Sequence, residues 1–198
     1  MEKQIWKPGT LLSPVPPAIV TCGSMERPNL LTVAWTGIVN SNPPMTYVSI
    51  RPERYSYGLI KESGEFAINL TTGALVRAAD FCGVRSGKDL DKFEAVHLHP
   101  QKAEKISAPL LAESPLSLEC RVVKALPLGS HEMFLAEIVA VQVDASLVDE
   151  NGRLNLGKCN LAAYAHGEYF ALGKRIGTFG FSVKKRRRSP PSRKKQAK

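Results

Sequence analysis

The sequence contains few of the short motifs that identify common enzyme classes. It has no GxSxG turn, no HExxH helix, no GxxxxGK[ST] loop and no GxGxxG segment after a strand, which argues against several hydrolase, metalloprotease and nucleotide-binding classes. His97 and His99 stand two residues apart, but no acidic or cysteine ligand follows at the spacing of zinc sites, so we expect no metal centre. No apolar run approaches the roughly 20 residues of a membrane span.

Cysteine is also scarce, with four residues far apart and no CxxC pair. Cysteines of this kind are typical of reduced, buried thiols in an intracellular protein. The first residues lack the continuous apolar core and small-residue cleavage site of a secretory leader. We therefore expect a soluble cytoplasmic protein that does not associate with membranes.

Acidic residues are absent from the last fifteen positions, and this explains the formal net charge of +9. Residues 184–198 hold nine Lys or Arg, which leaves 18 basic and 18 acidic residues in 1–183. We expect 1–183 to form one domain and 184–198 a disordered basic tail. The tail could bind nucleic acid non-specifically, serve as a localisation signal, or be an inert extension; without aromatic residues it does not suit sequence-specific recognition.

Short β-branched and aromatic runs separated by turns dominate the rest of the chain. We predict strands at 18–22, 30–39, 45–50 and 65–70, and long alternating strands at 116–122 and 132–144. Helices are predicted at 55–62, and at 75–82 with Gly83 as a left-handed stop. This pattern indicates a mainly β protein, a β-barrel with a few short helices.

Residues 49–57 place two arginines, a serine and a helix start within one turn. Guanidinium groups, a hydroxyl and the free N–H groups of a helix start suit a phosphate dianion. The alternative is a solvated turn in which Arg51 or Arg54 pairs with Glu53 or Glu62.

Three further segments have two interpretations each. Residues 82–88 combine glycines with Arg85 and Lys88, which suits an anion-binding nest, though alone the signal is weak. Residues 29–37 carry an amide, hydroxyls and an indole, as a flat heteroaromatic ligand requires; Trp35 packed into the core is the alternative. His131 lies in a predicted turn, where it either meets a ligand or has no role.

Five short blocks, in one order within residues 10–180, together resemble the flavin reductase-like, FMN-binding split-barrel family, and within it the flavoredoxin group. The blocks are Asn29 to Thr36, Pro43 to Ser56, Gly64 to Asn69, Cys82 to Phe93, and His131 to Ile138.

The resemblance implies a split-barrel homodimer that holds FMN non-covalently near the subunit interface. It implies that residues of one strand border the flavin and its ribityl chain: Asn29, Thr32, Trp35 and Thr36. A second segment would lie along the isoalloxazine edge: Ser49, Ile50 and Arg51. The phosphate would be held by Arg54, Ser56, Ser86 and Lys92. His131 would lie near the nicotinamide site, although Ser130 stands where the family has Asp.

The implied activity is an FMN-dependent oxidoreductase. It would take electrons from NADH or NADPH and pass them to free flavin, a ferric chelate or a partner protein. The alternative is a flavoredoxin-type electron carrier with bound FMN and no direct NAD(P)H turnover. No catalytic side chain is expected in either case, because FMN carries the hydride chemistry.

Overall fold

One antiparallel sheet of seven strands, in the order β2-β1-β5-β8-β9-β4-β3, forms the body of the protein. A computed structural model describes residues 1–183; the basic segment 184–198, predicted to be a disordered tail, lies outside the described residues. The fold is the mainly β barrel with a few short helices that the sequence predicts. The strands are β1 (Ala18–Gly23), β2 (Pro28–Val33), β3 (Thr36–Ser41), β4 (Pro44–Ile50), β5 (Glu65–Asn69), β8 (Leu116–Pro127) and β9 (Glu132–Val143).

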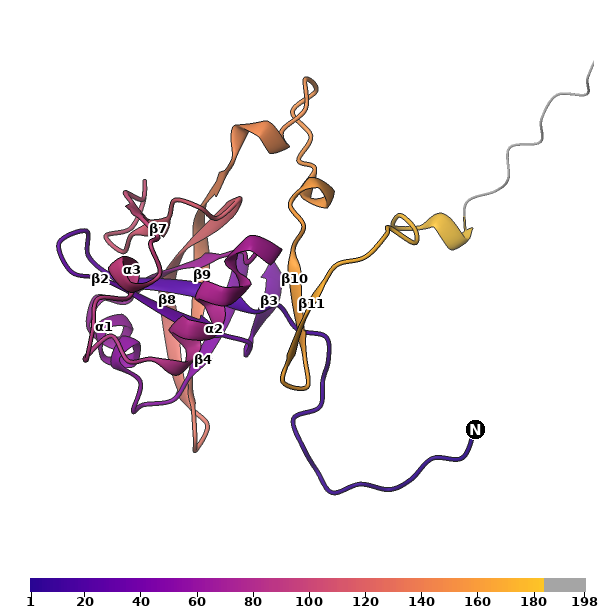
Figure 1. Cartoon of the computed structure of the whole chain (residues 1–198), viewed down its shortest axis with the longest axis horizontal. Helices are drawn as coiled ribbons and strands as arrows, with labels where there is room; N and C mark the ends of the chain where they lie inside the picture. The colour runs from indigo at the N-terminus through magenta and orange to yellow at the C-terminus, as the bar shows by residue number, and fades with distance from the viewer. Residues whose placement is uncertain (184–198) are drawn as a thin grey trace, which may run out of the picture.

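Short elements fill the connections between these strands. Helix α1 follows β4, and α2 and α3 lie between β5 and β8 (Figure 1). Two small hairpins complete the described part of the chain. The helices are α1 (Tyr55–Ser63), α2 (Val76–Val84) and α3 (Lys92–Ala95), with 3₁₀ turns at Gly73–Leu75, Ala145–Leu147, Leu156–Lys158 and Phe181–Val183; the small strands are β6 (Pro100–Gln101), β7 (Leu110–Leu111), β10 (Ala162–Ala165) and β11 (Glu168–Ala171).

Strand β1 is buried on both faces because it separates two apolar clusters. Val20 and Cys22 point into the barrel with Phe66 and Phe134. Ile19 points the other way and packs with residues of β2, α2 and α3. The alternation of strand side chains thus places the barrel core on one face of β1 and the helices on the other.

Several boundaries differ from the sequence-based expectation: β8, predicted at 116–122, runs on to Pro127, and two interior breaks are placed differently. The predicted strand 30–39 is interrupted, since β2 ends at Val33 and β3 begins at Thr36. The carbonyl of Trp35 accepts a hydrogen bond from Ser49 N (2.9 Å), which draws this break toward β4. Gly83 lies inside α2 and does not end it, whereas Gly64 does end α1 in left-handed geometry (φ 68°).

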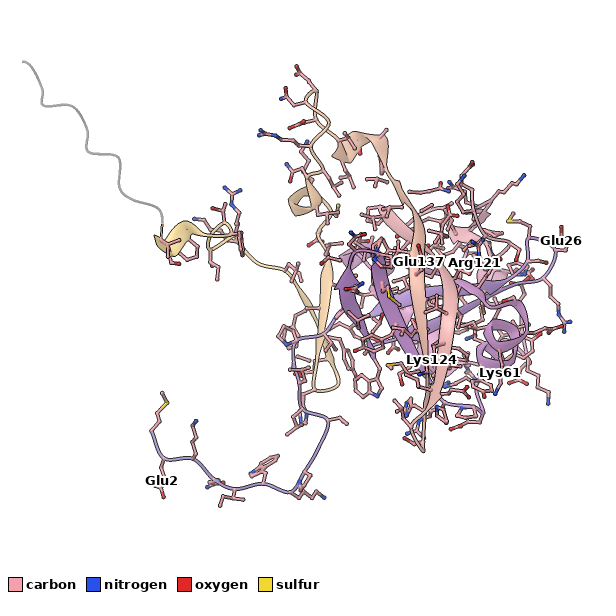
Figure 2. All side chains as sticks on the ribbon, turned by 180° about the vertical axis from the view of Figure 1, so that it is seen from behind. Glu2, Glu26, Lys61, Arg121, Lys124 and Glu137 are labelled. Carbon is pink, nitrogen blue, oxygen red and sulfur yellow. The ribbon has the colours of Figure 1, made fainter. Side chains whose placement is uncertain are left out.

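The two ends of the described chain leave the body on the side of β3 and the β10–β11 hairpin (Figure 1). Figure 2 shows the opposite side, where Arg121, Lys124 and Glu137 lie along the β8–β9 ribbon. Arg121 and Glu137 are partners across these strands. Within residues 1–183, no helix has the length and apolar character needed to cross a membrane.

Candidate functional site

A cavity of about 310 Å³ lies where β2 ends, β4 ends and α2 passes over the barrel. The break between β2 and β3 turns Trp35 outward, leaving it 37% exposed, so the structure does not support its packing as a core side chain. Strand β4 delivers its last residues to the same space. Of the residues selected from the sequence, this first cavity brings together Thr32, Trp35, Ser49, Ile50, Arg51, Arg54 and His131.

A second cavity of about 300 Å³ opens beside the start of α1. It shares Leu31, Arg51 and Arg54 with the first cavity, so the two adjoin. Its remaining lining comes from Glu53 and the first residues of α1, from the turn after α2 and from α3. The selected residues gathered here are Arg51, Arg54, Ser56, Ser86 and Lys92, and Arg85 and Gly87 join them.

The second cavity carries uncompensated positive charge. Arg51 pairs with Glu53 (3.6 Å), as expected for a solvated turn. Among residues 1–183, no carboxylate lies within ion-pair distance of Arg54 or Arg85. The first turn of α1 contains no acidic residue and no side-chain cap, so its N–H groups add to the positive potential.

Asn29 lies outside both of these cavities and supports the second from beneath. It is 4% exposed, and its Nδ2 donates to Ser56 Oγ (2.6 Å). The backbone of Gly87 passes so close that a Cβ there would collide with Asn29 Oδ1. Asn29 therefore positions the Ser56 hydroxyl through this hydrogen bond and packs against the backbone of Gly87.

Lys92 is held mainly by backbone carbonyls. Its side chain is buried, and Nζ donates to the carbonyl oxygens of Leu30 (2.7 Å) and Cys82 (2.8 Å). Burial lowers the pKa of the ammonium group, and the charge of Arg54 lowers it further. Lys92 thus ties β2 and α2 to α3 at the edge of the second cavity.

The two threonines selected from the sequence separate in the structure. Thr32 Oγ1 donates to the Ala79 carbonyl (2.5 Å) and lines the first cavity. Thr36 is buried, donates to the Tyr47 carbonyl (2.6 Å) and lies outside both cavities. Lys88 likewise lines neither cavity, although the nest interpretation grouped it with Arg85.

Sequence reasoning missed the hairpin that borders the first cavity. Tyr164 on β10 and Tyr169 on β11 line it, with their ring centroids 5.2 Å apart in an edge-on arrangement. Tyr169 OH donates to Asp80 Oδ1 (3.4 Å) on α2. Burial and the Asp80 carboxylate raise the pKa of Tyr169 to about 12. No local motif marks these residues, because a long-range approach of β10–β11 brings them to the cavity.

His131 lies at the tip of the β8–β9 hairpin and lines the first cavity from below the end of β4. Its Nδ1 is 2.9 Å from Ser130 Oγ. The selected histidine thus does reach the cavity, as the ligand-contact interpretation requires.

Comparison with known proteins gives a consistent family signal. Residues 11–173 match the model of the flavin reductase like domain. An uncharacterised protein of Aeropyrum pernix is 38% identical over 132 residues, covering 66% of this chain and 50% of the relative, so the match spans about half of that relative's length. An NADPH-flavin oxidoreductase of Streptomyces viridifaciens is 29% identical over 144 residues, 70% of this chain and 72% of the relative. The structure of flavoredoxin from Desulfovibrio vulgaris (Miyazaki F) superposes with a TM-score of 0.85 at 33% identity, covering 92% of this chain and all of that one.

Proposed function

This chain belongs to the flavin reductase-like domain family, with its FMN-binding split-barrel fold, and we propose that it binds FMN and transfers electrons through it. The observation that carries the proposal is the pair of adjoining cavities of different character. The two have nearly the same volume, but the first is bordered by the aromatic side chains of Trp35, Tyr164 and Tyr169, whereas the second is lined mainly by arginine, lysine and serine side chains. FMN has the same division, a flat ring system joined by a ribityl chain to a phosphate.

The second cavity fits the phosphate. Arg54 has a guanidinium group without an acidic partner in residues 1–183, and the first turn of α1, which lines this cavity with Tyr55 and Ser56, has no side-chain cap. Ser56 and Ser86 add hydroxyl groups. A dianion placed here would gain charge-assisted hydrogen bonds without displacing an existing ion pair of Arg54. Asn29 would hold the Ser56 hydroxyl in place, and Lys92 would hold the backbone at Leu30 and Cys82.

The first cavity fits the ring system. Trp35 and the β4 segment Ser49–Arg51 would border the ring, and Thr32 would lie where ring and phosphate regions meet. Bound FMN would supply the hydride and electron-transfer chemistry. The chain's own residues would orient one face of the ring, exclude water from it and leave the other face open toward His131 and the tyrosine pair.

Two functions use this site. The first is an oxidoreductase that accepts electrons from NADH or NADPH and reduces free flavin, a ferric chelate or a partner protein; the Streptomyces viridifaciens relative, an NADPH-flavin oxidoreductase, supports it. The second is an electron carrier without direct NAD(P)H turnover, which the similarity to flavoredoxin over nearly the whole chain favours. We propose the first, because His131, which the family resemblance places near the nicotinamide site, lines the first cavity. In either case the working unit would be a homodimer.

A visible spectrum of the purified protein tests FMN binding. We expect a yellow protein, or uptake of added FMN by the colourless form, and protein that takes up no FMN would exclude both functions. Mixing the FMN-loaded protein with NADH or NADPH in a stopped-flow instrument then separates the two. Rapid bleaching of the flavin band supports the oxidoreductase, whereas bleaching only by a protein or chemical reductant supports the carrier.

A further inference from the structure

Both ends of the described chain form extended arms with large, uncovered apolar side chains. Residues 1–9 run away from the body, and residues 172–183 leave beside the β10–β11 hairpin (Figure 1); Figure 2 shows Glu2 far from the barrel. Trp6 is 71% exposed, Ile176 97% and Phe179 fully exposed. Such side chains in monomeric proteins are normally covered, so the arms indicate an interaction surface.

The exposed area of the chain supports this interpretation. The whole chain exposes 14243 Å², whereas a compact protein of its mass exposes about 9,200 Å². Even fifteen fully exposed residues beyond 183 would account for only about 2,600 Å² of the difference. At least about 2,400 Å² remains, which is the area that each subunit of a large obligate dimer buries.

An apolar groove lies on the side of the molecule from which the arms depart. We call it the Trp35 groove; its volume is about 420 Å³. It shares Ala34, Trp35 and Ser49 with the first cavity and therefore adjoins the proposed flavin site across the indole of Trp35. The N-terminal segment of the same chain forms one wall of the groove with Thr10, Leu12 and Val15, and the body contributes Trp35, Tyr47, Leu128 and Met133.

The sheet edge next to this groove is also uncovered. Strand β3 ends the sheet order, so one of its sides has no neighbouring strand within residues 1–183. Ile38 on this strand is 67% exposed and Val39 is 51% exposed. An open edge with exposed aliphatic residues is a site for pairing with another chain unless something covers it.

We propose that two copies of this chain exchange their C-terminal arms, so that Phe179 and Phe181 of each copy pack into the Trp35 groove of the other. The arm from 172 to 183 has 12 residues and spans at most about 40 Å when extended, enough to cross a subunit of this size. A two-fold axis makes the exchange reciprocal.

The exchanged arm would contribute directly to the ligand site, and this part of the inference rests on the proposed function. Trp35 lines both the first cavity and the groove. An aromatic ring seated in the groove would fix the indole by edge or offset stacking. The flavin site of each copy is then completed by an arm of the other copy.

Site-directed cross-linking tests the exchange. In a Cys159→Ser background, in which the other three cysteines are buried, one tagged subunit carries Phe179→Cys and an untagged subunit carries Leu128→Cys. After mixing and oxidation, we expect a disulfide only between the two kinds of subunit. Leu154→Cys replaces Leu128→Cys as the control; it is 44% exposed but lies outside the groove, and should give no product. No cross-link to position 128, or an equal yield at 154, would overturn the proposal.

A second variant connects the arm to the flavin. Phe179→Ser with Phe181→Ser changes only exposed positions, so the barrel should fold. We expect weaker dimerisation in sedimentation and at least about tenfold weaker FMN binding at low protein concentration, recovered at high concentration. Phe170→Ser on β11 is the matched control. A wild-type protein that binds FMN as a monomer would overturn the arm exchange but not the proposed function. A cross-linked dimer that takes up no FMN would support the arm exchange and overturn the proposed function.

Discussion

The ammonium group of Lys92 donates to the carbonyl oxygen of Leu30 across 2.7 Å, from a side chain that is 3% exposed. A second bond reaches the Cys82 carbonyl at 2.8 Å. This lysine therefore ties β2 to α2 at the edge of the second cavity, and it stabilises the site through the backbone.

Replacing Lys92 by Met should destabilise the protein. The variant leaves two buried carbonyls without donors, and we expect a loss of about 3 kcal/mol in the free energy of unfolding. Urea denaturation measures it. Lys88→Met changes an exposed lysine in the same segment and should stay within about 0.5 kcal/mol of wild type. Equal stability of the two variants would contradict the role given to Lys92.

Replacing Gly87 by Ala should weaken FMN binding. The new Cβ would displace Asn29, which then loses its hydrogen bond to Ser56. We expect about tenfold weaker binding, equivalent to one lost hydrogen bond in the phosphate cradle. The matched control is Gly58→Ala in α1, where a Cβ meets nothing within 4 Å. That variant should bind FMN normally and be more stable by about 0.5–1 kcal/mol, because alanine favours the helix.

Replacing Arg54 by Met should discriminate between FMN and riboflavin. Riboflavin lacks the phosphate, so its binding should change little, whereas FMN should bind about 10–100-fold more weakly after loss of a charge-assisted contact. Fluorescence titration with both flavins gives the ratio. Arg77→Met alters an exposed arginine that lines neither cavity and serves as the control. If both flavins weakened equally in the Arg54 variant, the second cavity would not be the phosphate site.

Local signals in the sequence were sufficient for the elements that local interactions determine. Helix α1 is bounded by the turn after Pro52 and by Gly64, and both limits follow from backbone preferences of these residue types. The interruption at Ala34–Trp35 could not be predicted, because it lies where the chain changes its long-range pairing partner, from β1 for β2 to β4 for β3. The position of Gly83 inside α2 is similar: packing of Ala79 and Cys82 continues the helix past it.

The site residues likewise fall into two groups: those that local sequence reveals and those that only the fold brings together. Residues of the turn after β4 were recognisable because Arg51, Arg54 and Ser56 lie close together in the chain. Tyr164 and Tyr169 were not, since only the docking of the β10–β11 hairpin, with the Tyr169–Asp80 contact, brings them to the first cavity. The burial of two other residues could not be predicted from the sequence either. Asn29 donates to Ser56, and Lys92 lines the second cavity while its ammonium group donates to backbone carbonyls.

Glu119 should make the stability of the fold depend on pH in the acid range. The carboxylate is fully buried in β8 and accepts hydrogen bonds from Glu104 N (3.0 Å), Lys105 N (2.6 Å) and Gln142 Nε2 (2.7 Å). Burial alone would raise its pKa, but these bonds to the charged form outweigh burial and lower the pKa below the ordinary 4.5.

A carboxyl whose pKa is lower in the folded than in the unfolded state contributes stability above the unfolded value, and that contribution is lost as the pH falls through the folded value. Glu119→Gln removes the charge while keeping the shape. The difference in unfolding free energy between wild type and this variant should be largest near neutral pH and should shrink below about pH 4.5. Urea titrations of both proteins from pH 7 to pH 3 measure it, with the exposed Glu168→Gln as control. A difference that stays constant over this range would show that Glu119 contributes through its shape and not through its charge.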